Sequence, residues 1–138
     1  MAPRLILDSG GLTALANAEP RALAWAYRAT QQGMLYGVPV PVLAETITGR
    51  PQDAKLYRVL SSADLFIETT AEIARAAGVM RFRAKAPEKT VDALVVASAA
   101  HYPRSILLTS DPVDLTLLAN QVPDTGLVIR SVNSAPRT

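Results

Sequence analysis

The chain has 138 residues, enough for one compact domain with its own hydrophobic core. Hydrophobic residues make up 49% of it and charged residues 19%, a balance that excludes a disordered chain. The absence of cysteine excludes disulfide frameworks, zinc–thiolate sites and thiol nucleophiles. No segment has the pattern of a signal peptide or membrane span, so we expect one cytoplasmic domain over residues 1–138.

The net charge of +2 indicates little about partners, but the basic residues are unevenly distributed. Between residues 75 and 89, one acid, Glu88, lies among five basic residues: Arg75, Arg81, Arg83, Lys85 and Lys89. Such a segment either contacts phosphate groups or forms a solvated helix end, and the sequence leaves both interpretations open.

Short apolar runs alternate with segments of helical character along the chain. In chain order, we expect a strand over 5–7, a helix over 20–32, a strand over 34–38, helices over 41–48 and 52–60, a strand over 65–67, a helix that starts near 70, a helix over 90–100, a strand over 106–108, a helix over 112–120 and a strand over 127–129.

Two helix starts carry capping residues in the sequence. Thr69 followed by Glu72 forms a capping box for a helix that carries Ile73, Ala76, Ala77 and Met80 on one face. Thr90 is the expected cap of the helix over 90–100.

The alternation of strands and helices predicts an α/β fold with a largely parallel central sheet and helices on both faces. In such folds, ligands bind outside the carboxyl ends of the strands. Asp8 and Asp111 each fall just after a predicted strand, so topology alone places both acids in that crevice.

Three acids are each the only charged residue of an apolar stretch: Asp8 within 5–18, Glu45 within 29–49, and Asp92 within 90–103. A buried carboxylate is costly unless it is paired or binds a metal. No lysine or arginine of the same elements pairs with Glu45 or Asp92, so compensation must come from elsewhere. Acids with charged neighbours, such as Asp53, Asp64, Glu72 and Glu88, are expected at the surface.

Each acid also has a purely structural interpretation. Asp111 before Pro112 is a normal helix N-cap, Asp8 before Ser9 can cap in the same way, and Asp92 lies in a first helical turn. Glu45 has no capping task. Because clustered carboxylates repel each other, a shared site requires a cation, and oxygen ligands select Mg²⁺ or Mn²⁺.

Four segments, in order, resemble the PIN-domain family and, within it, the VapC toxins of type II toxin–antitoxin systems. They are Ile6-Leu7-Asp8-Ser9, Leu43-Ala44-Glu45-Thr46, the helix from Thr90-Val91-Asp92-Ala93 to Ala99, and Leu108-Thr109-Ser110-Asp111. The sequence departs from the family at Gly10, often a small polar residue there. Asp114 is an alternative to Asp111 as the fourth acid.

The resemblance implies a PIN-like fold and a Mg²⁺-dependent endoribonuclease, with Mn²⁺ as a substitute ion, that cleaves RNA such as tRNA or another structured RNA. It implies Asp8, Glu45, Asp92 and Asp111 as catalytic metal ligands, with Ser9 and Thr109 holding the carboxylates in place. It also implies a cognate VapB-type antitoxin and a homodimer. Arg81, Arg83 and Lys85 are the candidate RNA contacts. The alternative is a catalytically silent PIN-like module that binds RNA or protein.

Overall fold

The computed structural model describes residues 2–122 and 126–136. Its strands are β1 (Arg4–Leu7), β2 (Leu35–Pro39), β3 (Leu65–Ile67), β4 (Ile106–Thr109) and β5 (Val128–Ser131). Its helices are α1 (Ser9–Ala16), α2 (Pro20–Gln31), α3 (Val40–Thr46), the 3₁₀ turn η1 (Pro51–Asp53), α4 (Ala54–Leu60), α5 (Ala71–Arg83), α6 (Thr90–Ala100) and α7 (Pro112–Ala119). Within this part of the chain, no helix is long and apolar enough to span a membrane.

The five strands form one sheet in the order β3-β2-β1-β4-β5, and all neighbouring strands are parallel. The predicted α/β fold with a parallel sheet is therefore confirmed. The strand order changes direction at β1, which lies between β2 and β4. Ligand crevices of open parallel sheets lie outside the carboxyl ends of strands at such a switch point.

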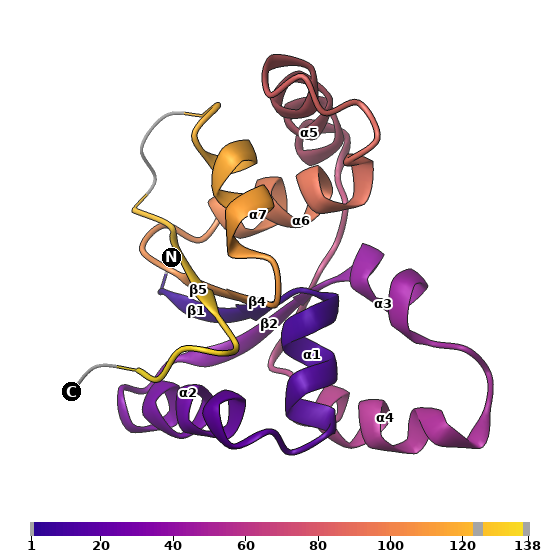
Figure 1. Cartoon of the computed structure of the whole chain (residues 1–138), viewed down its shortest axis with the longest axis vertical. Helices are drawn as coiled ribbons and strands as arrows, with labels where there is room; N and C mark the ends of the chain where they lie inside the picture. The colour runs from indigo at the N-terminus through magenta and orange to yellow at the C-terminus, as the bar shows by residue number, and fades with distance from the viewer. Residues whose placement is uncertain (1, 123–125, 137–138) are drawn as a thin grey trace.

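Helices cover both faces of the sheet, as expected (Figure 1). Helices α1, α2 and α4 lie on one face, and α5, α6 and α7 lie on the other. The short helix α3 lies beyond the carboxyl ends of the strands, where it contacts both α1 and α6.

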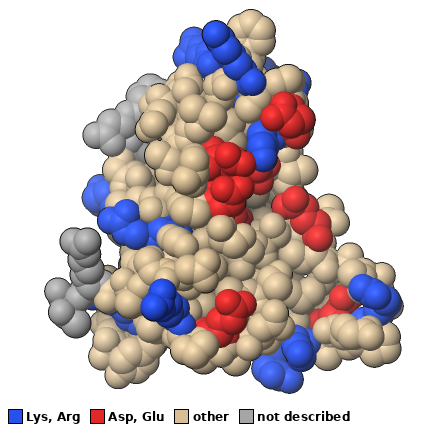
Figure 2. All heavy atoms as spheres, viewed as in Figure 1, with Lys and Arg blue, Asp and Glu red and all other residues tan. Residues whose placement is uncertain are grey.

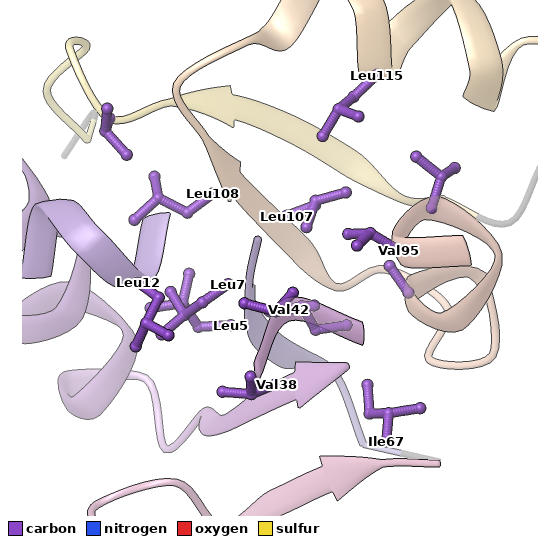
Figure 3. Close-up of a cluster of buried hydrophobic side chains, with 14 of the residues drawn as sticks. Leu5, Leu7, Leu12, Val38, Val42, Ile67, Val95, Leu107, Leu108 and Leu115 are labelled. Carbon is purple, nitrogen blue, oxygen red and sulfur yellow. The ribbon is translucent and has the colours of Figure 1, made fainter. Parts of the chain in front are cut away.

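The core is built on the central strand and its two helical layers. Leu5, Ile6 and Leu7 of β1 are fully buried, because the side chains of a central parallel strand face helices on both sides. Leu12 of α1 packs near β1, while Val95 of α6 fills the opposite layer (Figure 3). Burial of each such side chain stabilises the fold by about 1.5–3 kcal/mol.

Helix α1 was not predicted, because Gly10 and Gly11 have low helix propensity. The structure requires both glycines for another reason: α1 starts against the end of β4. A Cβ atom added to Gly10 would lie 2.1 Å from Ser110 Oγ, and one added to Gly11 would lie 2.4 Å from the Leu108 carbonyl oxygen. Close packing therefore outweighs local propensity here.

The caps predicted for α5 and α6 were each wrong by one residue. The cap of α5 is Thr70, whose Oγ1 accepts a hydrogen bond from the Ile73 N–H at 3.1 Å. Ala76 is exposed, so the buried face of α5 consists of Ile73, Ala77 and Met80. Helix α6 has Lys89 at its N-cap and Thr90 as its first helical residue.

Several further boundaries differ from the expected ones by one or two residues, since local pattern fixes element ends poorly. Helix α3 ends at Thr46 instead of residue 48, and β5 covers Val128–Ser131 instead of 127–129.

Asp53 was expected at the surface, but it is only 5% exposed. Its carboxylate accepts three hydrogen bonds, from the Thr48 N–H at 2.9 Å, the Thr48 hydroxyl at 2.8 Å and the Gly49 N–H at 2.7 Å. The Thr48 hydroxyl is the main reason that the pKa of Asp53 is lowered. Charged neighbours in sequence did not reveal this local role, which shapes the turn between α3 and α4.

Candidate metal and active site

The segments that follow β1 and β4 place two acids at the switch point. Asp8 follows β1 directly and caps α1, and Asp111 lies two residues after β4 and caps α7. Leu7 pairs with Leu108, and the Asp8 N–H donates to the Leu108 carbonyl oxygen at 3.3 Å. The parallel register therefore brings both chain segments to the same edge of the sheet, as topology predicted.

Asp8 is held in place by both of the segments that meet there. It is 8% exposed, and its Oδ1 accepts the Gly11 N–H at 2.8 Å. The fully buried Thr109 also hydrogen-bonds to the Asp8 side chain. Thr109 Oγ1 in turn accepts the Asp111 N–H at 2.9 Å. Thr109 thus links the two acids, which supports the positioning role proposed for it.

Glu45 comes from α3, above the carboxyl edge of the sheet, and is exposed. A hydrogen bond with Ser9 acts on the Glu45 carboxylate and links α3 to the first turn of α1. This hydrogen bond lowers the pKa of Glu45, although the larger causes raise it. Glu45 lines a groove of about 540 Å³ together with Ser9, Gly10 and Glu19. Glu19 was not among the predicted site residues, since in sequence it only precedes the proline that opens α2.

Asp92 lies in the first turn of α6, partly buried. Burial is the largest cause that raises the pKa of Asp92, and the charge of Lys89 at the N-cap of the same helix opposes this effect. Lys89 Nζ lies 2.7 Å from Asp114 Oδ2, the one salt bridge among the described residues. Lys89 thus brings a positive charge near Asp92 but pairs with Asp114, so the expectation that Asp92 needs compensation from elsewhere stays a prediction.

Electrostatics show which acids share one environment. Burial is the largest cause that raises the pKa of Asp8, and the charge of Asp92 raises it further. The Glu45 side chain is exposed, but partial desolvation of its carboxylate is the largest cause that raises its pKa, followed by the charges of Asp92 and Asp8. The pKa of Asp92 is raised by burial, with added contributions from Asp111 and Asp114. Asp8, Glu45, Asp92 and Asp111 are hereafter called the acidic crevice.

Figure 2 shows acidic side chains gathered in the hollow between α1 and α3 on one side and α6 and α7 on the other. Nevertheless, no group of three or more acidic or histidine side chains in residues 2–122 and 126–136 is close enough to hold a metal ion. The structure thus brings the acids into one crevice, coupled by charge, but does not bring them to a common point.

The donor chemistry of the crevice fits a hard divalent cation. Its side chains offer only carboxylate oxygens, and mutual repulsion and burial raise the pKa values of Asp8, Glu45 and Asp92. Asp114 fits less well than Asp111, because Lys89 already pairs with its carboxylate and lowers its pKa.

The candidate RNA contacts lie at the end of α5 and in the loop that follows. Arg81 Nη1 donates to the Pro87 carbonyl oxygen at 2.6 Å, so this guanidinium also supports its own loop. Arg83 and Lys85 are exposed, and Lys85 has a positive φ of 56°. Figure 2 shows basic side chains over this end of α5, above the acidic crevice in that view.

Comparisons with solved structures agree with this architecture. A chain of VapBC2 from Rickettsia felis, solved with a DNA fragment from its promoter, superposes with a TM-score of 0.65 and 16% sequence identity, over 92% of this chain and 97% of that one. A chain of DNA-bound VapBC from Salmonella typhimurium gives a TM-score of 0.63 and 15% identity, over 94% and 98% of the two chains. This chain has the PIN-like fold. No protein-family model matches its sequence, and no curated protein matches it significantly.

The PIN-like fold agrees with the family suggested by the sequence motifs. At 15–16% identity the likeness concerns the fold, so the functions of the acids rest on their own geometry and charge.

Proposed function

We propose that the protein is a metal-dependent endoribonuclease of the VapC toxin type. The observation that carries this proposal is the acidic crevice at the β1–β4 switch point, where the pKa values of Asp8, Glu45 and Asp92 are all raised. Carboxylates placed this way lower the stability of the fold when no ligand compensates their charge. Their arrangement at one edge is what a phosphodiesterase site that binds Mg²⁺ or Mn²⁺ needs.

Asp8, Glu45, Asp92 and Asp111 are the proposed ligands of Mg²⁺ or Mn²⁺. The bound ion would polarise the scissile phosphate and activate a water molecule. Asp8 is the best-fixed ligand, because Gly11 and Thr109 hold its side chain. Glu45 is exposed on a short helix, so its carboxylate is placed to accept a proton from the attacking water molecule.

Thr109 and Ser9 are the proposed positioning residues of the acids. Thr109 orients Asp8 and fixes the backbone of Asp111, while Ser9 restrains Glu45. The proposed substrate is RNA, such as tRNA or another structured RNA. Its backbone would approach the crevice from the basic end of α5, where Arg83 and Lys85 are free to neutralise phosphates and Arg81 contributes its charge.

The proposed partner is a VapB-type antitoxin, by analogy with the two VapBC complexes whose chains share the fold. A basic side chain of the antitoxin placed near the acidic crevice would neutralise the charge of its carboxylates and would not support catalysis. We also propose a homodimer. Light scattering of the isolated protein, and copurification with the product of the neighbouring gene, test these two assignments separately.

The alternative is a silent PIN-like module, and a metal titration with an RNA cleavage assay separates the two. The parent protein is incubated with a tRNA mixture in EDTA and in Mn²⁺, in parallel with Asp8→Asn and the distant control Asp64→Asn. The proposal expects Mn²⁺-dependent cleavage by the parent and the control, and none by Asp8→Asn. Metal-independent cleavage, or equal activity of Asp8→Asn, would overturn it, while RNA binding without any cleavage would favour the silent module.

A further inference from the structure

A second polar cavity lies at the opposite edge of the sheet from the acidic crevice. It has a volume of about 970 Å³ and lies beside the first residues of β4 and β5, Ile106 and Val128. Strands β1, β2 and β4 are four or five residues long, which separates the two edges by about 13–17 Å. The cavity is therefore distinct from the crevice that holds the acids.

The charged residues that line this cavity are all arginines: Arg28 of α2, Arg104 before β4, and Arg130 of β5. Among the residues that the structure describes, no acid lines it, and none of the three arginines takes part in a salt bridge. Figure 2 shows basic side chains beside β5, on the left of the view, away from the gathered acids. Arginine side chains that line one cavity offer several charged donors to phosphate oxygens, and Arg130 Nη1 also donates to the Ile129 carbonyl oxygen at 3.1 Å.

Arg104 is held at this cavity by an unusual backbone. Its φ of 66° lies in the left-handed region that side chains rarely adopt. Gly126 lies against its stem, where an added Cβ would be 3.1 Å from Arg104 Cγ. A strained conformation at a charged residue is a feature that often marks a ligand site.

The carbonyl end of α2 also faces this region and by itself would disfavour an anion. Its last carbonyl groups are occupied, however, because the Gln32, Gly33 and Met34 N–H groups donate to them. The remaining wall holds the polar residues Gln32 and Ser134 and an apolar part that includes Met34 and Trp25, whose Nε1 donates to the Ser134 carbonyl oxygen at 2.8 Å. The cavity therefore combines a cationic side with an apolar side, and its volume suits a small ligand.

We propose that this cavity, hereafter the arginine pocket, binds a nucleoside phosphate, with phosphate oxygens on Arg28, Arg104 and Arg130 and the base against the apolar wall. The ligand is a free nucleotide or the 5′-terminal nucleotide of an RNA chain. Neither the acids nor a metal ion takes part.

Trp25 is the only tryptophan of the chain, so its fluorescence reports on the pocket directly. The parent protein is titrated in EDTA, which excludes metal chemistry at the acids, with pyrophosphate, ADP and a 5′-phosphorylated trinucleotide in separate experiments. We expect saturable changes, with ADP or the trinucleotide binding more tightly than pyrophosphate. Tighter binding of ADP identifies a free nucleotide as the ligand, and tighter binding of the trinucleotide identifies an RNA end.

The variant Arg28→Gln/Arg130→Gln should bind at least about tenfold more weakly, because charge-assisted hydrogen bonds are lost. The control Arg58→Gln/Arg75→Gln makes the same charge change at exposed positions outside the pocket and should bind like the parent. Asp8→Asn should also bind like the parent, which separates this proposal from the nuclease. No saturable change with any probe, equal affinity of the Arg28/Arg130 variant and the parent, or equal affinity for pyrophosphate and ADP would overturn the assignment.

Discussion

The ammonium group of Lys89 lies 2.7 Å from the Asp114 carboxylate, at the margin of the acidic crevice. Its charge lowers the pKa of Asp92, whereas Asp111 and Asp114 raise it. Lys89 is thus a cation built into the fold, close to the place where the proposed metal ion would bind.

Replacing Lys89 with Gln should strengthen Mn²⁺ binding by about three- to tenfold at low ionic strength, because a positive charge that repels the metal is removed. Calorimetric titration of the metal-free protein measures this change. Lys55→Gln on α4 is the matched control, since Lys55 is exposed and is not among the charges that shift the pKa of Asp8, Glu45 or Asp92. Unchanged or weaker Mn²⁺ binding by Lys89→Gln would show that its charge does not reach the metal.

The stability of the metal-free protein should rise as the pH falls from neutral to about pH 5. The pKa values of Asp8, Glu45 and Asp92 are raised in the folded state, so in this range the folded protein binds more protons than the unfolded chain. The lowered pKa of Asp53 acts in the opposite direction, but only in more acidic solution. Denaturant melts in EDTA across this range measure the effect, and a saturating concentration of Mn²⁺ should abolish it. A stability that falls steadily from neutral pH would contradict it.

The strands and the edge at which the acids gather could be predicted from the sequence, because buried parallel strands are short apolar runs and their ends carry the isolated acids. Helix α1 could not be predicted, since Gly10 and Gly11 are required by their close contact with Ser110 and Leu108, about a hundred residues along the chain. The same holds for Lys89, whose partner Asp114 is 25 residues away.

The glycine contact of α1 gives a stability prediction with a built-in control. Gly11→Ala should lower the free energy of unfolding by about 1–3 kcal/mol, because the added Cβ meets the backbone carbonyl of Leu108 at 2.4 Å. Gly78→Ala in α5 meets nothing within 4 Å and should raise it by about 0.5–1 kcal/mol through helix propensity. Urea melts measure both. If both variants were stabilised, the close approach of α1 to β4 would be wrong.

The buried turn at Asp53 should control the position of Glu45. Asp53→Ala leaves the Thr48 and Gly49 N–H groups and the Thr48 hydroxyl without their acceptor, so we expect a lower melting temperature. Because this turn follows α3, RNA cleavage should fall as well, and Glu68→Ala, at an exposed acid, is the control. An unchanged melting temperature would contradict the buried role of Asp53 and would favour the exposed position that its neighbours in sequence suggested.

The last prediction concerns RNA contact at the end of α5. Arg83 and Lys85 are exposed, whereas Arg81 also bonds to the Pro87 carbonyl oxygen. On single-stranded RNA, each neutralised phosphate contributes about −0.7 to the slope of log K against log salt concentration. Replacing Arg83 and Lys85 with Ala should therefore reduce the steepness of this slope by about 1.4. Replacing Arg81 as well should reduce the steepness by about 2 in total. The triple variant should also have a lower melting temperature, since the loop after α5 loses the hydrogen bond from Arg81. Binding is measured with the non-cleaving Asp8→Asn protein as background, and Arg58→Ala/Arg75→Ala is the charge-matched control. A slope that is the same in the α5 variant and in this control would show that the basic end of α5 is a solvated helix end, the other interpretation that the sequence left open.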